Sequence, residues 1–128
     1  MPFLGPDWLR RTLDLAADQP ERPGASVRVQ FVVGGGPGGE ARYHWVVEDG
    51  QLRSAAAGNL DGAEMTWTAT YSDAVAMFRG ELDPGAAFME GRVKVAGDMG
   101  KVLTLLPLLA TDTYCELNDK LASETSFT

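Results

Sequence analysis

The sequence has few of the residues that hold small proteins together covalently or through metals. It contains one cysteine and one histidine in 128 residues. A single cysteine cannot form an internal disulfide, and one residue of each type cannot make a metal site. Long apolar runs are also missing, since the longest, at residues 102–110, is far short of the ~20 residues of a membrane span. We therefore expect no stable membrane insertion and, without a signal peptide, a reducing cytoplasmic location.

Positive charge is scarce as well. The chain has 11 Lys and Arg against 18 Asp and Glu, a formal net charge of −7. An acidic surface repels phosphate, so nucleic acid and strongly anionic membranes are poor partners. Hydrophobic residues make up 45% and charged residues 23%, which are ordinary values for a globular protein. The length suits a single domain spanning residues 1–128.

Hydrophobic periodicity predicts an α+β fold. Apolar residues recur every three or four positions over residues 7–18, which predicts an amphipathic helix. Apolar and polar residues then alternate in four successive segments, the pattern of half-buried strands: 27–33, 41–47, 52–57 and 64–70. The links between them are short, and this predicts an antiparallel meander because parallel strands need long crossovers.

The period changes in the second half of the chain. The predicted elements there are helices at 72–79 and 83–90, a strand at 92–96, and helices at 99–106 and 113–123. Asp83 and Asp98 are expected helix caps, and Pro107 is expected to kink or stop its helix. Thr113 and Glu116 have the spacing of a capping box. The tail after the last helix is expected to be loose.

Three features that suggest chemistry have simpler interpretations. Residues 34–39 read Gly-Gly-Gly-Pro-Gly-Gly and match the dinucleotide-binding pattern, but a strand follows where that pattern needs a helix, so we interpret them as a hairpin loop. His44 shares a strand face with Arg42 and has no nucleophile beside it, which favours a surface histidine. Cys115 has no basic neighbour in the sequence, so we interpret it as structural. We predict no catalytic residue, no metal and no cofactor.

Methionine and aromatic residues are spread over most of the predicted elements. In proteins generally, residues of these types line adaptable apolar pockets. Composition alone nevertheless favours an ordinary hydrophobic core. The helix at 99–106 shifts the balance toward a pocket, because it is apolar nearly all round and must be covered on two sides. The sheet can cover one side, and an apolar ligand or a partner subunit could cover the other.

Residues 91–99, Gly-Arg-Val-Lys-Val-Ala-Gly-Asp-Met, resemble the strand-into-helix signature of sterol carrier protein 2-like (SCP2) lipid-binding domains. Residues 71–74 and 83–90 resemble the two-helix insertion of that family. The order of predicted elements also agrees. The resemblance covers residues 27–109, and the N-terminal helix more loosely, while a helical extension over 112–123 lies beyond it.

This resemblance implies a five-stranded, mainly antiparallel sheet with helices packed on one face, enclosing an apolar tunnel. The family binds fatty acyl chains, acyl-CoA or sterols there, with no cofactor and no catalysis. Carried over by position, the expected ligand-binding residues are Phe31, Trp45, Met65, Trp67, Met77, Phe78, Phe88, Met89, Met99, Val102, Leu103 and Leu106. The helix at 99–106 is expected to form one wall of the tunnel, so that Leu103→Trp would block ligand.

Two functions of different classes stay open. The first is binding, with or without transfer, of a fatty acid, acyl-CoA, sterol or other long apolar ligand. The second is a structural or protein-interaction domain, acting as an accessory or dimerisation module to an enzyme, because this fold also occurs appended to enzymes. A homodimer belongs to this alternative. An isomerase or hydrolase that uses His44 is a distant third.

Overall fold

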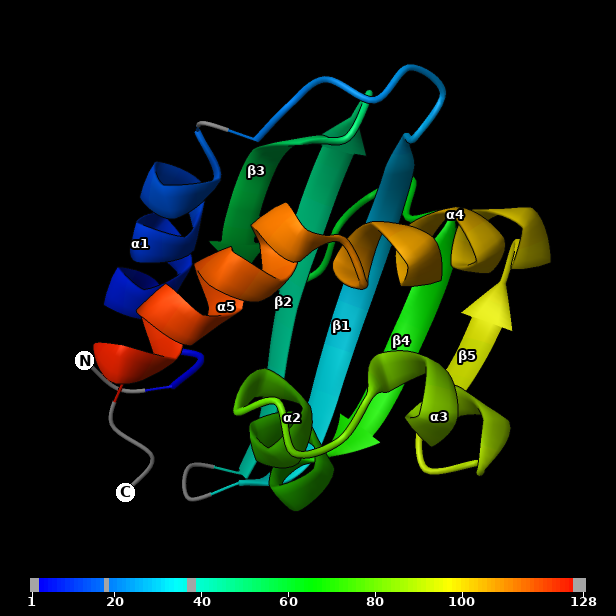
Figure 1. Ribbon diagram of the computed structural model, residues 1–128. Helices are drawn as coiled ribbons and strands as arrows, with labels where there is room; N and C mark the ends of the chain where they lie inside the picture. Colours follow the sequence, from blue (N-terminus) through cyan, green and yellow to red (C-terminus); the bar gives the residue numbers. More distant parts are fainter. Residues whose placement is uncertain (1–2, 18, 37–38, 126–128) are drawn as a thin grey trace.

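The fold is a five-stranded sheet with the helices packed on one of its faces (Figure 1). The structure, a computed structural model, describes residues 3–17, 19–36 and 39–125. The strands are β1 (Val27–Gly36), β2 (Gly39–Glu48), β3 (Gln51–Ala57), β4 (Met65–Thr70) and β5 (Lys94–Gly97). The helices are α1 (Pro6–Ala16), α2 (Tyr71–Phe78), α3 (Pro84–Met89), α4 (Met99–Leu109) and α5 (Asp112–Ser123). In the described residues, no helix is long and apolar enough to cross a membrane.

The strand order is β3-β2-β1-β4-β5. The pairs β1–β2, β2–β3 and β4–β5 are antiparallel, whereas β1 and β4 are parallel, with Val29 opposite Met65. The predicted fold class, a mainly antiparallel five-stranded sheet with helices on one face, is therefore confirmed. The prediction of a four-stranded antiparallel meander is wrong at its fourth strand.

The connection from β3 to β4 explains this difference. The last residue of β3 lies level with Phe31 of β1, and the first residue of β4 lies level with Val29 of β1. The link between them therefore runs across the strands and does not have to follow the length of a strand. Reaching past β2 and β1 takes three strand spacings, about 14 Å. The seven residues of the link, 58–64, can extend to about 23–25 Å. A short link is therefore enough for this parallel pairing.

The buried side chain of Gln30 holds the crossover against the outer face of the sheet. Its Nε2 donates to the backbone carbonyls of Tyr43 and Gly58 at 3.1 and 3.2 Å, and its Oε1 accepts from the backbone N–H of Leu60 at 2.7 Å. His44 Nδ1 lies 3.0 Å from the same Gly58 carbonyl. The outer face of β1 and β2 is thus covered here, and His44 is half-buried instead of a free surface residue.

Side-chain caps begin three of the helices. Thr70 Oγ1 accepts from Asp73 N–H, Asp83 Oδ2 from Ala86 N–H and Asp98 Oδ1 from Gly100 N–H. The predicted caps Asp83 and Asp98 are confirmed. The capping box predicted for the last helix is wrong, because its N-cap is Thr111, which makes no side-chain cap.

The chain passes Pro107 without leaving α4, which continues to Leu109. Of the two outcomes expected at Pro107, a kink or a stop, the stop is therefore wrong. Proline removes the donor to the carbonyl one turn earlier, that of Leu103. Both residues are exposed, so this carbonyl lies on the solvent side of the helix.

The core lies between the inner face of the sheet and the helices. Its fully buried members include Val27, Val29, Val47, Met65, Val102, Leu105, Tyr114 and Leu121. Leu117, on the same face of α5 as Tyr114 and Leu121, is buried here too. Burial raises the pKa of Tyr114 to about 12, and its hydroxyl donates to the Gly50 carbonyl at 3.0 Å.

The glycine-rich segment joins β1 to β2. Gly36 pairs directly with Gly39 across the two strands, so a strand follows the glycines and the hairpin interpretation is confirmed. Residues 37–38 lie outside the described residues, as do residues 126–128 of the tail.

Candidate functional site

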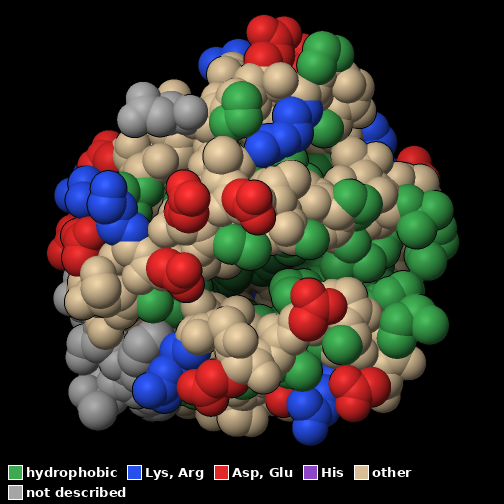
Figure 2. Space-filling view, viewed as in Figure 1, with side chains coloured by type: hydrophobic (Ala, Val, Ile, Leu, Met, Phe, Trp, Pro, Cys, Tyr) green, Lys and Arg blue, Asp and Glu red, His purple; other side chains and the backbone are tan. Residues whose placement is uncertain are grey.

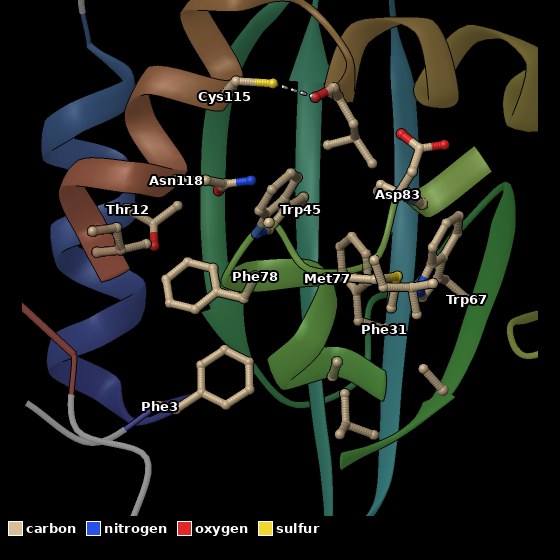
Figure 3. Close-up of a pocket in the computed structure, with 18 of the residues that line it drawn as sticks. Phe3, Thr12, Phe31, Trp45, Trp67, Met77, Phe78, Asp83, Cys115 and Asn118 are labelled. Atoms are coloured by element: carbon tan, nitrogen blue, oxygen red, sulfur yellow. Dashed lines mark hydrogen bonds between the residues drawn. The ribbon is translucent and has the colours of Figure 1, made fainter. Parts of the chain in front are cut away.

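A cavity of about 330 Å³ lies between the sheet and the helices (Figure 3). The space-filling view shows the surface hollowed between α5 and α2 (Figure 2). Ligand sites commonly have volumes of roughly 300–1,000 Å³ and a predominantly apolar lining. The cavity therefore has the size and position of a ligand site for a small or medium apolar molecule.

Aromatic side chains of the sheet form the cavity floor. They come from β1, β2 and β4, as Phe31, Tyr43, Trp45 and Trp67. The rings of Phe31 and Tyr43 stack with centroids 4.6 Å apart, and Trp45 meets Phe31 edge to face at 5.1 Å. Strand alternation places these side chains on one face. Their mutual packing makes the floor apolar and well ordered.

Side chains from α1, from the segment before it and from α2 close one side of the cavity. Trp8 lies edge to face with Phe78 at 5.5 Å, and Phe3 stacks on Phe78 at 5.1 Å. Met77 of α2 points into the space beside them (Figure 3). All 3 tryptophans of the chain, Trp8, Trp45 and Trp67, line the cavity. Their fluorescence can therefore report on the occupancy of this space.

The polar part of the lining is acidic or neutral. It includes Asp83 before α3, together with Cys115, Asn118 and Asp119 of α5. Within the described residues, no Lys, Arg or His lines the cavity. Cys115 Sγ lies 3.8 Å from the Leu109 carbonyl, its hydrogen-bond acceptor (Figure 3). Burial raises the pKa of Tyr43 above its usual range, so its phenol stays uncharged.

Two indole N–H donors at the cavity are unsatisfied. Trp8 Nε1 and Trp45 Nε1 are buried and have no hydrogen-bond partner among the described residues. Trp8 is 3% and Trp45 8% exposed, and both line the cavity. Buried donors normally find a partner, so each unsatisfied one calls for an explanation.

The structure brings five of the twelve predicted ligand-binding residues together at the cavity: Phe31, Trp45, Trp67, Met77 and Phe78. The others do not line it. Met65 and Val102 belong to the packed core, and Phe88 and Leu106 are half-buried against it.

The remaining three predicted residues are on the surface. Met89 is 82% exposed, Met99 51% and Leu103 69%. The expected wall at residues 99–106 is therefore absent from this cavity. Only the end of α4 reaches it, through Leu109, followed by Ala110. The buried face of α4 packs on the sheet, and the opposite face points to solvent.

Sequence reasoning missed several lining residues. Tyr43 could have been found, because it alternates with Trp45 on the inner face of β2. Trp8, Asp83 and Asn118 gave no such signal, because their place at the cavity depends on how α1, α3 and α5 pack. His44 lies on the opposite face of the sheet.

The model of the SCP-2 sterol transfer family matches residues 9–110. Sterol carrier protein 2 from Gallus gallus is 34% identical over 76 residues, and that from Homo sapiens 36% over 76 residues. Each alignment covers 59% of this chain but 14% of the relative. The chain therefore corresponds to a small part of these curated relatives.

Solved structures share the fold. The crystal structure of sterol carrier protein 2 like 2 from Aedes aegypti has a TM-score of 0.61 at 17% identity, covering 77% of this chain and 88% of that one. The solution structure of the palmitated form has a TM-score of 0.64 at 17% identity, covering 80% and 89%. At these identities the likeness concerns the fold alone.

Proposed function

Because the chain belongs to the SCP-2 sterol transfer family, we propose that it binds a fatty acid, acyl-CoA, sterol or other long apolar molecule without catalysing a reaction. The observation that carries this proposal is the cavity of about 330 Å³ with its aromatic lining. The names of the relatives, sterol carrier proteins and a palmitated form among them, support a lipid as the ligand. Transfer between membranes is a further step that the same cavity would permit.

The energetics favour a useful affinity. A ligand that buries about ten methylenes gains ~8 kcal/mol before the entropic costs of association. Contacts with the aromatic rings of the floor add to that gain. We therefore expect micromolar affinity or better for the preferred ligand.

The arrangement of reactive side chains supports a non-catalytic role. His44 faces the crossover on the other side of the sheet, away from the cavity. Cys115 lines the cavity, but no described basic side chain lines it to activate the thiol. The Cys115 thiol donates to the backbone carbonyl of Leu109 instead of to a side chain that could act as its general base.

Two measurements test the proposal. Solvent extraction of the purified protein, followed by mass spectrometry, should recover a lipid. After delipidation, long-chain ligands should displace a fluorescent fatty-acid probe and change the tryptophan emission. No binding of fatty acids, acyl-CoA or sterols up to their solubility would contradict the function.

One observation favours an interaction module as the second candidate. Met89, Met99 and Leu103 form an exposed apolar patch on α3 and α4, and Figure 2 shows hydrophobic side chains gathered over these helices. Such patches commonly mark contact surfaces. A homodimer through this patch would show in sedimentation, and Met99→Gln with Leu103→Gln should dissolve it. A monomer at all concentrations would exclude this homodimer.

The domain boundaries, the location and the role of α5 belong to the same proposal. Residues 1–128 would act as one lipid-binding unit in the cytoplasm, and α5 would cover another side of the cavity. The net charge of −7 argues against nucleic acid as a partner.

A further inference from the structure

The charge of the cavity lining bears on which lipids it accepts. Asp83 and Asp119 line the cavity, and within the described residues no cationic side chain does. Figure 2 shows that acidic side chains border the hollow on more than one side. A carboxylate or phosphate headgroup placed here would meet like charges without a partner. The lining therefore disfavours an anionic ligand.

A second observation, independent of charge, concerns hydrogen bonding inside the cavity. Trp45 is 8% exposed, lines the cavity and leaves its Nε1 donor without a described partner. Figure 3 shows the indole of Trp45 pointing into the space between the sheet and α5. Trp8 Nε1 is a second unsatisfied donor of the same lining. An unpaired buried donor costs free energy that a ligand with an acceptor oxygen would recover.

We propose that this site selects uncharged lipids that carry an acceptor oxygen, such as an ester, ketone or alcohol, over anionic lipids such as fatty acids and acyl-CoA. The inference rests on the proposed lipid-binding function and narrows its ligand class. The aromatic floor takes the hydrocarbon chain. Trp45 donates to the oxygen, and Asp83 and Asp119 exclude a negative headgroup.

Three ligands with the same chain length separate these contributions. Delipidated protein is titrated at neutral pH with dodecanoate, methyl dodecanoate and dodecane, following tryptophan emission. The ester is expected to bind at least about tenfold more tightly than dodecanoate, a difference equivalent to about 1.4 kcal/mol. Equal affinities, or tighter binding of dodecanoate, would overturn the inference and leave lipid binding intact. No binding of any of the three, nor of longer fatty acids, acyl-CoA or sterols up to their solubility, would refute the proposed function itself.

The charge contribution is tested with two double variants of equal net charge. Asp83→Asn with Asp119→Asn should raise the affinity for dodecanoate relative to that for methyl dodecanoate several-fold, and Asn still caps α3 at position 83. Asp14→Asn with Asp61→Asn removes two carboxylates that do not line the cavity and should leave the ratio of affinities unchanged. The same gain in both variants would overturn the role of Asp83 and Asp119.

The donor contribution is tested by Trp45→Phe, which keeps an aromatic ring and removes the N–H. The preference for methyl dodecanoate over dodecane should fall about two- to tenfold, the range of one net hydrogen bond. Both ligands lose the same ring contacts, so their ratio isolates the donor. An unchanged ratio in both Trp45→Phe and Trp8→Phe would refute hydrogen bonding to the ligand.

Discussion

Filling the cavity from the sheet is the most direct test of whether it is open space. Ala69 of β4 is 5% exposed and lines the cavity, so a larger side chain at this position points into it. Ala55 of β3 is 6% exposed and does not line it. Ala69→Phe and Ala55→Phe therefore add the same atoms at two buried strand positions that differ in the space beside them.

The expected stability changes have opposite signs. A phenyl ring that enters open space gains roughly 1.5–3 kcal/mol of burial, reduced by whatever adjustment the neighbouring rings need. Overpacking a filled site typically costs about 1–3 kcal/mol. For a chain of this size, 1 kcal/mol corresponds to about 3–6 °C in melting temperature. We expect Ala69→Phe to melt at or above the parent temperature and Ala55→Phe to melt several degrees below it.

The assay combines thermal melts followed by circular dichroism with ligand titration of the delipidated protein. Ala69→Phe should bind methyl dodecanoate at least about tenfold more weakly, because the ring occupies space that the chain would take. Leu103→Trp serves as the surface control: at 69% exposure it should change neither stability nor binding. Equal destabilisation by both alanine variants would show that the cavity is closed. If Leu103→Trp lost ligand binding while Ala69→Phe kept it, the ligand would bind at α4 and not in this cavity.

Three further perturbations test other parts of the structure. Gln30→Leu removes the hydrogen bonds that hold the β3–β4 crossover, including that to Leu60 N–H, and should lower the free energy of unfolding by about 2–4 kcal/mol in urea titration. A loss below 0.5 kcal/mol would contradict this role. His44→Ala loses one bond to Gly58 and should cost about 1 kcal/mol or less without changing lipid binding; loss of a measured activity would reopen an enzymatic function. Tyr114 has its pKa raised from 10.0 to about 12, so its contribution is complete below pH 10 and is lost as the pH rises toward 12. The expected loss of stability is on the order of 1–2 kcal/mol, and Tyr114→Phe should flatten the alkaline end of the stability curve.

Local structure could be read from the sequence, because it depends on residues that are neighbours along the chain. Asp83 followed by Pro84 begins α3, and Asp98 begins α4, since a short side-chain acceptor reaches the free N–H groups of the next turn. Alternation on β1, β2 and β4 identified the inner face of the sheet, and with it Phe31, Trp45 and Trp67 of the cavity floor. The motif at residues 91–99 pointed to the family.

Tertiary structure alone decided the pairing of β4 and the place of the cavity. The parallel partner of β4 depends on a crossover held by Gln30, a residue whose alternation indicated only an outward side chain. α4 is apolar nearly all round, so periodicity could not say that Val102 packs on the sheet while Leu103 points to solvent. The acidic lining joins Asp83 to Asp119, 36 residues apart in the chain, through the packing of α5 over the sheet. Such contacts depend on the free energy of packing whole elements together, and no local pattern encodes it.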